Sequence, residues 1–289
     1  MIGILRVKPM RFLLLKRFVV VLAVLLAIPG TAAAGVERLT YRAELNSVLT
    51  LFAWAHVGTV TVTSRDVDIC PGGGRCRQTE AWMTSESAPA LETVYPLRYL
   101  YRTAYLPERG ETLAFEILRN RRGADAYGWR HRVFWLHGQA ETAIRYDLDA
   151  EGERASDDLA DWAHTDKAGD LTLRVRNHRE VSMRLPALDR LGGLDMLRAE
   201  NLEPGASWRQ AGAGPKGSLT FIVTVEEQEV IQAGMRSWET WRIRAEERRE
   251  GDDGASAAPL YAWIATDAAR TPVRLAIDHP IGQVRLTLQ

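Results

Sequence analysis

Beyond residue 34, apolar and polar side chains alternate along most of the chain, which is the pattern of half-buried β-strands. Because successive side chains of a strand point to opposite faces, we expect one buried and one wet face of the sheet. The alternating segments are Leu39–Leu45, Thr59–Thr63, Gln78–Met83, Leu113–Ile117, His131–Trp135, Ile144–Leu148, Leu171–Val175, Leu219–Val225, Trp241–Ala245, Tyr261–Ala265, Val273–Ile277 and Val284–Leu288. Many short strands of this kind predict a mostly β fold. The expected architecture is a curved antiparallel sheet, barrel-like or a half-barrel, although a sandwich also satisfies the pattern.

A different period marks one short helix within the segment Pro186–Arg198. The leucines of this segment recur about every three residues, and a proline suits the first turn of a helix. Gly192 and Gly193 oppose the helix, since each costs about 1 kcal/mol relative to alanine. We therefore predict a single short helix in an otherwise β chain.

The segment from Asp149 to Asp170 has many acidic and few apolar residues. This composition is typical of a solvated loop. A loop of this length also suits a boundary between two domains, but the strands that follow it continue the same alternating pattern. We therefore expect a single antiparallel β domain over residues 35–289, with the long acidic loop inside it.

The first 34 residues have the composition of a secretory signal peptide. A basic region precedes an uncharged apolar run from Phe18 to Ile28, which Pro29 and Gly30 end. The small residues Ala32-Ala33-Ala34 then match the site that a signal peptidase reads. The apolar run is shorter than the roughly 20 residues of a membrane-spanning helix. We expect cleavage before Gly35, export to the periplasm and no integral membrane segment; an uncleaved membrane anchor is the alternative.

Removal of this segment changes the charge of the chain. The full sequence has 37 basic and 37 acidic residues, and the signal holds five of the basic ones, so the mature chain has 32 against 37. The resulting net charge of −5 is poorly suited to holding nucleic acid or an anionic membrane through bulk charge. We expect no nucleic-acid partner.

The two cysteines, Cys70 and Cys76, flank the loop sequence Pro-Gly-Gly-Gly-Arg between two predicted strands. An even count in an oxidising compartment favours a disulfide. The spacing differs from the C-x-x-C of metal and redox sites, and no histidine lies beside it. We predict a structural disulfide that closes the tip of a hairpin.

The sequence contains no H-E-x-x-H, G-x-S-x-G or G-x-x-x-x-G-K motif. The six histidines show no metal-ligand spacing. His131 lies on the same strand face as Val133 and Trp135, so we expect a hydrogen-bonded core residue rather than a ligand. We predict that the protein is not an enzyme and has no catalytic or cofactor-binding residues.

Two groups of acidic residues are the remaining candidates for chemistry. The first, a source of oxygen ligands for a divalent cation, comprises Asp157, Asp158, Asp161, His164 and Asp166. It has no glycine where a calcium loop turns, and runs of charge usually face solvent. The second, a candidate pair of hydrolase carboxylates, comprises Glu226, Glu227 and Glu229, which the end of a strand explains equally well. We predict no metal site.

The nine tryptophans are spread over the predicted strands. On a curved sheet such rings either fill the core or line an apolar ligand cavity. Core filling is the simpler interpretation.

Two segments carry a resemblance to a known family. The C-terminal segment contains Trp263-Ile-Ala-Thr-Asp267-Ala-Ala-Arg270-Thr-Pro272-Val273, followed by Gly282-Gln-Val284 and Leu288. The central segment contains Asp189-Arg-Leu191, Met196-Leu197-Arg198 and Leu202-Glu-Pro-Gly205, and Tyr95-Pro96-Leu97 is a weaker match. The chain thereby resembles an exported bacterial family catalogued as domain of unknown function 3108. The resemblance implies an exported β protein and no particular activity, cofactor or site; the cysteine loop and the acidic loop depart from the family pattern.

The C-terminal motif also has a direct structural interpretation. Asp267 suits a turn in which its carboxylate accepts from backbone N–H groups, with Arg270 as a partner. Pro272 has no N–H and suits the first residue of a strand. Gly282 suits the turn of the final hairpin. In that hairpin we expect the apolar residues to face the interior, and Arg274 and Arg285 to point to solvent.

Two non-enzymatic functions satisfy these observations. The leading hypothesis is a periplasmic protein whose curved sheet binds an apolar ligand or lipid. The alternative is a module for cell-envelope biogenesis that binds other envelope proteins through loops or an edge strand. A continuous apolar cavity favours the first function, and a filled interior favours the second.

Overall fold

The computed structural model describes residues 36–47, 50, 52–68, 70, 75–94, 96–122, 127–136, 141–148, 175–249, 258–279 and 282–289. The expected signal peptide and the expected acidic loop both lie outside these residues. The fold below is therefore that of the predicted mature domain without its acidic loop.

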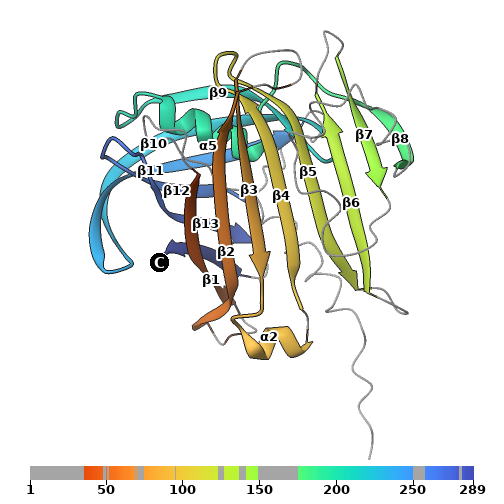
Figure 1. Cartoon of the computed structure of the whole chain (residues 1–289). Coiled ribbons are helices and arrows are strands. Elements are labelled where there is room, and N and C mark those ends of the chain that lie inside the picture. Colours follow the sequence, from red (N-terminus) through yellow and green to blue (C-terminus); the bar gives the residue numbers. More distant parts are fainter. Residues whose placement is uncertain are drawn as a thin grey trace, which may run out of the picture.

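The described residues form one antiparallel sheet of fourteen strands (Figure 1). In space the strands follow the order β8-β7-β6-β5-β4-β3-β2-β1-β14-β13-β12-β11-β10-β9. The strands are β1 (Glu37–Ser47), β2 (Trp54–Val67), β3 (Cys76–Thr84), β4 (Arg98–Leu106), β5 (Glu111–Arg122), β6 (Tyr127–Trp135), β7 (Thr142–Leu148), β8 (Val175–Ser182), β9 (Ser207–Gly214), β10 (Gly217–Ala233), β11 (Arg236–Arg249), β12 (Leu260–Ala265), β13 (Pro272–His279) and β14 (Gly282–Leu288). The predicted mostly β, antiparallel fold is confirmed, and the sheet is not closed, because β8 and β9 are two separate edges.

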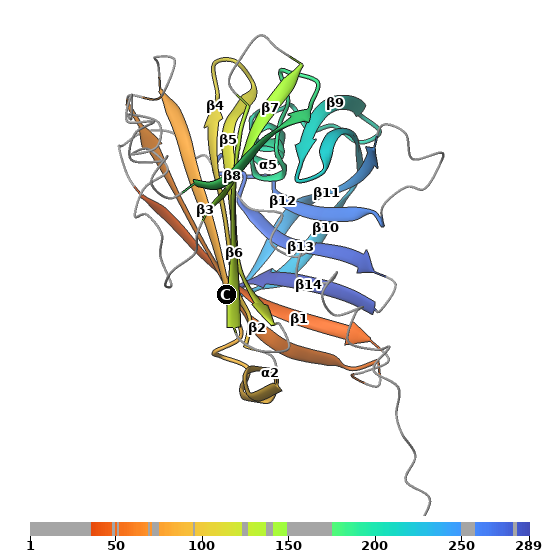
Figure 2. The same ribbon diagram turned by 90° about the vertical axis from the view of Figure 1, so that its right-hand side faces the viewer.

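The sheet bends so that its two halves lie at a steep angle to each other (Figure 2). Strands β2–β8 form one half and β9–β14 the other, with β1 beside β14 at the bend. Helix α5 (Arg190–Ala199) lies between the halves, and the short helix α2 (Pro89–Val94) links β3 to β4. The interior is therefore the space between the two inner faces of one sheet.

Side chains from both halves and from α5 fill this interior as one hydrophobic cluster. Its largest fully buried members are mostly aromatic, namely Tyr41, Tyr99, Tyr101, Phe115 and Phe134. Phe115 stacks between Tyr101 and Phe134, with ring centroids 5.9 and 4.5 Å apart. Burial of each such ring is worth roughly 2–3 kcal/mol, so these residues hold the two inner faces together.

Four elements differ from the sequence-based expectation. Strands β4 and β9 and helix α2 were not expected, and β8 was expected only at Val175. Strand β4 shows why: its burial runs without a break from Tyr99 to Leu106, so both of its faces are covered. A strand buried on both faces has no reason to alternate between apolar and polar residues.

The predicted helix is present, but it begins four residues later than Pro186. Asp189 caps it, accepting from the N–H groups of Leu191 and Gly192. A capping carboxylate satisfies N–H groups that the first turn leaves free, which fixes the start of the helix. Leu188, expected on the helix, instead forms a bridge to Gly212 of β9.

The C-terminal hairpin has the expected register, with Leu275 paired to Leu286 and both side chains buried. Arg274 and Arg285 lie on the opposite face as expected, but neither simply points to solvent. Arg285 forms an ion pair with Glu44 at 2.8 Å and covers the ring of Trp54. Arg274 lies 5.8 Å from the centre of the Trp263 ring, so both arginines of this outer face contact an aromatic side chain.

Two motif positions have the predicted roles. Pro272 is the first residue of β13. Gly282 has a φ of 141°, and a Cβ there would lie 2.0 Å from the carbonyl oxygen of Asn46. Only glycine fits, because β1 passes directly against the turn.

Candidate functional site

Cys70 and Cys76 form the predicted disulfide. Cys76 is the first residue of β3 and is paired in register with Val67, the last residue of β2. Both cysteines are buried against Leu106 and neighbouring apolar residues of β4 and β5. The bridge therefore closes the tip of the β2–β3 hairpin and anchors it to the sheet.

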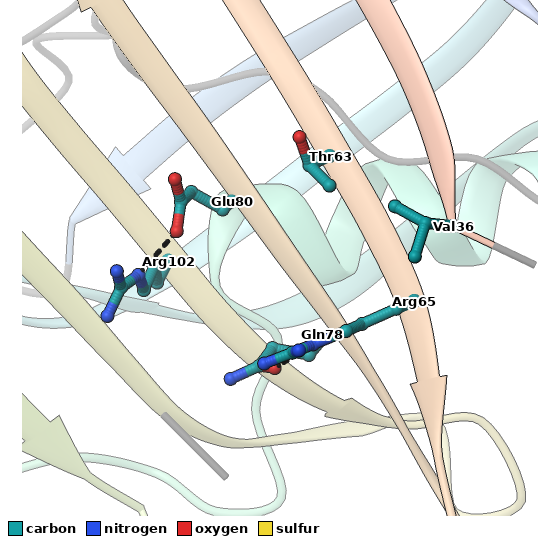
Figure 3. Close-up of a pocket in the computed structure, with 6 residues that line it drawn as sticks. All are labelled: Val36, Thr63, Arg65, Gln78, Glu80 and Arg102. Carbon is teal, nitrogen blue, oxygen red and sulfur yellow. Dashed lines mark hydrogen bonds and ion pairs between the residues drawn. The ribbon is translucent and has the colours of Figure 1, made fainter. Parts of the chain in front are cut away.

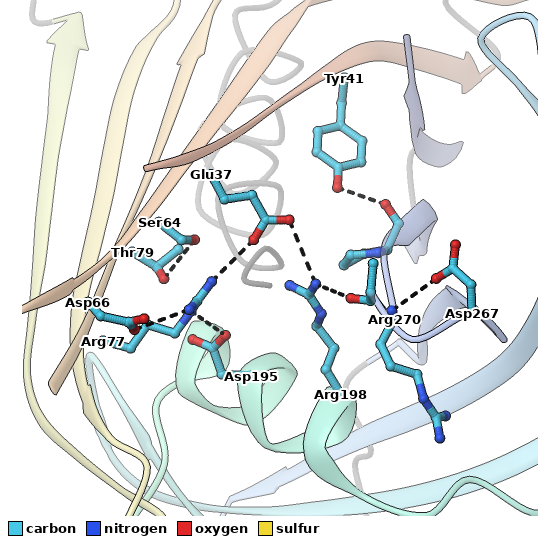
Figure 4. A network of polar contacts seen from close by, with 12 residues as sticks. Glu37, Tyr41, Ser64, Asp66, Arg77, Thr79, Asp195, Arg198, Asp267 and Arg270 are labelled. Carbon is cyan, nitrogen blue, oxygen red and sulfur yellow. Dashed lines mark hydrogen bonds and ion pairs between the residues drawn. The ribbon is translucent and has the colours of Figure 1, made fainter. Parts of the chain in front are cut away.

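A buried polar network joins α5 to β1, β2 and β3 (Figure 4). At its centre is Arg77 of β3, whose guanidinium lies 3.2 Å from Glu37, 3.2 Å from Asp66 and 3.3 Å from Asp195. Arg77 and Asp195 are almost fully buried. One cation thus meets three carboxylates from three different elements.

Arg198, one turn further along α5, extends this network to the other half of the sheet. It lies 3.8 Å from Glu37 and donates from Nη2 to the carbonyl oxygen of Ala269 at 2.5 Å. Beside it, the Tyr41 hydroxyl donates to the carbonyl oxygen of Pro272 at 2.7 Å. The network therefore ties the turn before β13 to β1 and α5 (Figure 4).

Burial sets the electrostatics of this network. It raises the pKa of Asp195 to about 7, against the lowering effect of Arg77 and Arg198. It lowers the pKa of Arg198 to about 9. Neither oxygen of Asp195 accepts a hydrogen bond. Such a network is a costly substitute for an apolar core, but the loss of one member leaves other charges buried and unpaired.

Asp189 forms a second buried polar centre at the start of α5. Its Oδ1 accepts from the hydroxyls of Thr103 at 2.8 Å and Thr112 at 2.7 Å. Burial raises the pKa of this carboxyl, and the two hydroxyls oppose that shift. Asp189 therefore holds the helix start against β4 and β5.

The outer face of the sheet carries a series of alternating charges across strands β3, β4, β5 and β6. Arg102 lies 2.7 Å from Glu80 and 3.4 Å from Glu116, and Glu116 contacts Nε2 of His131. His131 is buried, as expected for a hydrogen-bonded core histidine. Each member contacts the next, from Glu80 through Arg102 and Glu116 to His131, so the arrangement satisfies charges rather than exposing a reactive group.

A polar pocket of about 190 Å³ lies beside two of these charged residues, Glu80 and Arg102 (Figure 3). It is lined by Val36, Thr63, Arg65, Gln78, Glu80 and Arg102. Nε of Arg65 donates to the side-chain oxygen of Gln78 at 2.7 Å, and Glu80 holds Arg102. The pocket contains guanidinium groups and one carboxylate, but no nucleophile with an adjacent base.

An apolar recess lies between α5 and the inner face of β9–β12. Its lining includes Leu194 and Leu197 of the helix and Phe221 and Val223 of β10. Its volume is about 40 Å³. Sites for small organic ligands usually measure about 300–1,000 Å³. The recess is therefore far smaller than a lipid chain requires.

The two edges of the sheet are protected to different extents. Along β9, Leu188 donates to the carbonyl oxygen of Ala211 at 3.0 Å and accepts from the N–H of Ala213 at 2.8 Å. Strand β8 is the last strand of the sheet, and its residues Arg176–Glu180 are all exposed. In the part of the chain that the structure describes, strand β8 thus pairs on one side alone, the feature through which sheets recruit further strands.

The candidate acidic residues have separate outcomes. The group at positions 157–166 lies outside the described residues. Glu226, Glu227 and Glu229 surround Arg242 at 3.0, 3.4 and 3.1 Å, next to an irregularity in β10. The three carboxylates pair with the single guanidinium of Arg242. The interpretation of these residues as the end of a strand did not predict this ion pairing. Within the described ranges, no His, Cys, Asp and Glu cluster is arranged to hold a metal ion.

Other motifs also find structural roles. Asp267 accepts from the backbone N–H of Arg270 at 3.1 Å, as expected, while the guanidinium near its carboxylate belongs to Arg236, at 3.9 Å. The run Gly212-Ala-Gly214-Pro-Lys-Gly217, which the sequence-based expectation of no G-x-G-x-x-G motif overlooked, has the spacing of that dinucleotide-binding motif. It forms the turn between antiparallel β9 and β10, so the strand-to-helix context of that motif is missing.

Four of the nine tryptophans belong to the hydrophobic cluster or pack against it. Trp263 is buried, and Trp208, Trp238 and Trp241 pack partly buried against the hydrophobic cluster. This agrees with core filling. No helix of the described ranges combines the length and apolar character needed to cross a bilayer.

The open, bent antiparallel sheet places the protein among the β-barrel-like proteins. Residues 133–289 match the family model described as Protein of unknown function (DUF3108). The chain belongs to this family, which confirms the resemblance of its central and C-terminal segments; the weaker Tyr95-Pro96-Leu97 match lies outside the matched range.

A solved structure is similar over nearly the whole chain. It is the crystal structure of a beta-barrel-like protein of domain of unknown function DUF1849 from Brucella abortus. The TM-score is 0.50 at 9% identity, covering 92% of this chain and 98% of that chain. The likeness shows a shared fold. No curated protein matches the chain.

Proposed function

We propose that the protein is a non-enzymatic periplasmic interaction module of the cell envelope, and that a partner protein binds along the edge strand β8. The observation that supports the proposal is the difference between the two edges. Leu188 covers part of β9, whereas Asn177–Glu180 of β8 are exposed and, among the described residues, pair with β7 alone.

The register shows which backbone groups a partner would use. Met183 donates its N–H to Glu141 at 2.9 Å, so this pair is hydrogen bonded across the two strands. Hydrogen-bonded and non-hydrogen-bonded pairs alternate along an antiparallel ladder. The N–H groups of His178 and Glu180 therefore point away from β7, toward the free edge, where an extended segment can add a strand.

The side chains of β8 suit selective binding rather than aggregation. The strand includes Arg176, Arg179 and Glu180, and charges on an edge oppose pairing with a second copy of the same chain. The alternative, a carrier that encloses a lipid, gains little from the interior, because the apolar recess beside α5 measures about 40 Å³. The small volume of this recess and the hydrophobic cluster beside it support the interaction module.

The test is a pull-down of the full chain from envelope extracts, with Glu180→Pro compared with Glu180→Ala. Proline removes the outward N–H and is tolerated at sheet edges, while alanine removes the side chain alone. We expect the alanine variant to retain the partner and the proline variant to lose it, with equal circular dichroism spectra. His178→Pro provides a second edge variant. Equal recovery with both Glu180 variants would contradict the proposal.

A further inference from the structure

The inner face of the sheet changes from apolar to basic as it approaches the open edge at β8. Four arginines on consecutive strands form what we name the arginine row: Arg119 (β5), Arg132 (β6), Arg145 (β7) and Arg179 (β8). The first three are paired in register with the core residues Tyr99, Ile117 and Phe134. Arg179 is paired with Arg145. Since directly paired residues share a face, the row lies on the inner face.

The row has a large surplus of positive charge. Asp147 is the one carboxylate seen among these side chains in the described part of the chain, and it accepts from Arg132 at 2.8 Å and from Arg145 at 2.6 Å. Arg119 and Arg179 form no ion pair with any described residue. Among the described side chains of the row, four guanidinium groups against one carboxylate leave a net charge of +3. Arg145 and Arg179 are direct cross-strand neighbours, and like charges in that position destabilise a sheet.

Two of the three steps along the row are diagonal, and the third joins direct neighbours. Arg119 pairs with Arg130, two residues from Arg132, and Arg132 pairs with Asp147, two residues from Arg145. Such diagonal neighbours have Cα atoms about 7–8 Å apart, and direct neighbours about 5 Å. In an extended chain, side chains on one side repeat every 6.6–6.8 Å or so. The steps from Arg119 to Arg132 and from Arg132 to Arg145 therefore match an extended segment with acidic residues at alternate positions, while Arg179 lies closer to its neighbour Arg145.

We propose that the arginine row binds an extended acidic segment of the partner protein, with carboxylates at every second residue. The inference rests on the proposed function, because it specifies the chemistry of the partner. Arginine suits this role, since its planar fork pairs with carboxylates bidentately and stays charged. Arg179 is exposed at the edge, whereas Arg145 is buried and Asp147 holds both Arg145 and Arg132, so Arg179 is the member that a partner reaches first.

The test uses a fluorescent peptide, acetyl-(Glu-Thr)4-amide, and measures its binding to the full chain by anisotropy at low and physiological salt. The uncharged control peptide is acetyl-(Gln-Thr)4-amide. We expect binding of the acidic peptide alone, weakened by salt. Arg119→Gln and Arg179→Gln should each weaken it about tenfold, since each removes one charge-assisted contact. Arg248→Gln, on an exposed arginine of β11, serves as the matched control and should bind as the wild type does.

Several results would overturn the inference: equal binding of both peptides, no binding at low salt, or an equal loss in Arg248→Gln. A chain whose acidic residues 149–170 are replaced by asparagine and glutamine must bind at least as tightly as the wild type, and weaker binding also counts against the row. The pull-down separates the two proposals. If the Arg119→Gln/Arg179→Gln double variant loses the peptide but keeps the envelope partner, the row is not the partner surface, and the role of β8 stands. If Glu180→Pro keeps the partner while the double variant loses it, the β8 edge fails and the row stands.

Discussion

Arg198 of α5 donates a hydrogen bond to the carbonyl oxygen of Ala269, so two segments that carry the family resemblance meet in space. Arg198 ends the Met196-Leu197-Arg198 run, and Ala269 lies in the turn between Asp267 and Arg270. The contact joins helix α5 to the turn before β13, in the half of the sheet formed by β9–β14. The two sequence segments that resemble the family therefore contact each other in the fold.

Replacement of Arg198 by alanine should destabilise the fold by about 3–5 kcal/mol, the usual cost of removing one partner of a buried ion pair. The side chain is buried, and its loss leaves Glu37 and the carbonyl of Ala269 without this partner. Urea unfolding monitored by tryptophan fluorescence measures the change. Arg248→Ala is the control, because that side chain is 57% exposed and should contribute at most about 1 kcal/mol. Similar unfolding midpoints for both variants would show that the buried contacts of Arg198 do not stabilise the fold.

Adjacent residues of β13 provide a test of the sheet register. Leu275 is 1% exposed, so Leu275→Ala should cost about 2–5 kcal/mol through lost burial and a cavity. Arg274 lies on the other face, where Nη2 is 3.4 Å from the carbonyl of Gln232. Arg274→Ala should cost about 1 kcal/mol or less. Urea midpoints measure both changes, and equal midpoints would show that the assigned faces are wrong.

The charge of Asp195 should make stability depend on pH. Its pKa is about 7 in the folded chain and 3.8 ordinarily, so between these values the folded chain holds a proton that the unfolded chain has released. The resulting stabilisation is complete below about pH 4 and is lost as the pH rises through 7. The wild type should therefore lose stability relative to Asp195→Asn from pH 4.5 to pH 8. Urea midpoints of both chains across this range measure the difference, and a constant difference would contradict the raised pKa.

The disulfide should contribute little to global stability. In the chain-entropy model a loop closed across six residues is worth about 2 kcal/mol. The Cys70→Ala/Cys76→Ala double variant should therefore remain folded. Its free energy of unfolding, measured by urea denaturation, should fall by about 2 kcal/mol or less. Thiol titration of the unfolded, non-reduced wild type should detect no free thiol. Two free thiols in protein taken from the periplasm would exclude the bridge in vivo.

The mature protein should begin at or near Gly35. N-terminal sequencing of chain extracted from the envelope measures this directly. Met1 at the N-terminus of that material, or Met10 if translation starts at this second methionine, would show that the segment is not removed and would favour the uncleaved anchor.

The sequence by itself determined the strands that have one buried and one wet face. In such strands apolar residues face the core and polar residues face water. The alternation in Val273–Ile277 and Val284–Leu288 was therefore sufficient to predict the final hairpin. The disulfide was predictable for a similar reason, because its partners are six residues apart and close a local turn. Helix α5 was recognisable from its leucines, although its start depends on the cap by Asp189.

Tertiary structure alone decided the rest. Glu37, Arg77 and Asp195 belong to elements far apart in the chain, and no local period relates them. Strand β4 gave no alternating signal because both faces are covered. The open edge at β8 and the arginine row follow from the order in which the strands pair. That order depends on how the apolar faces of distant segments pack against each other, and a linear pattern does not contain it.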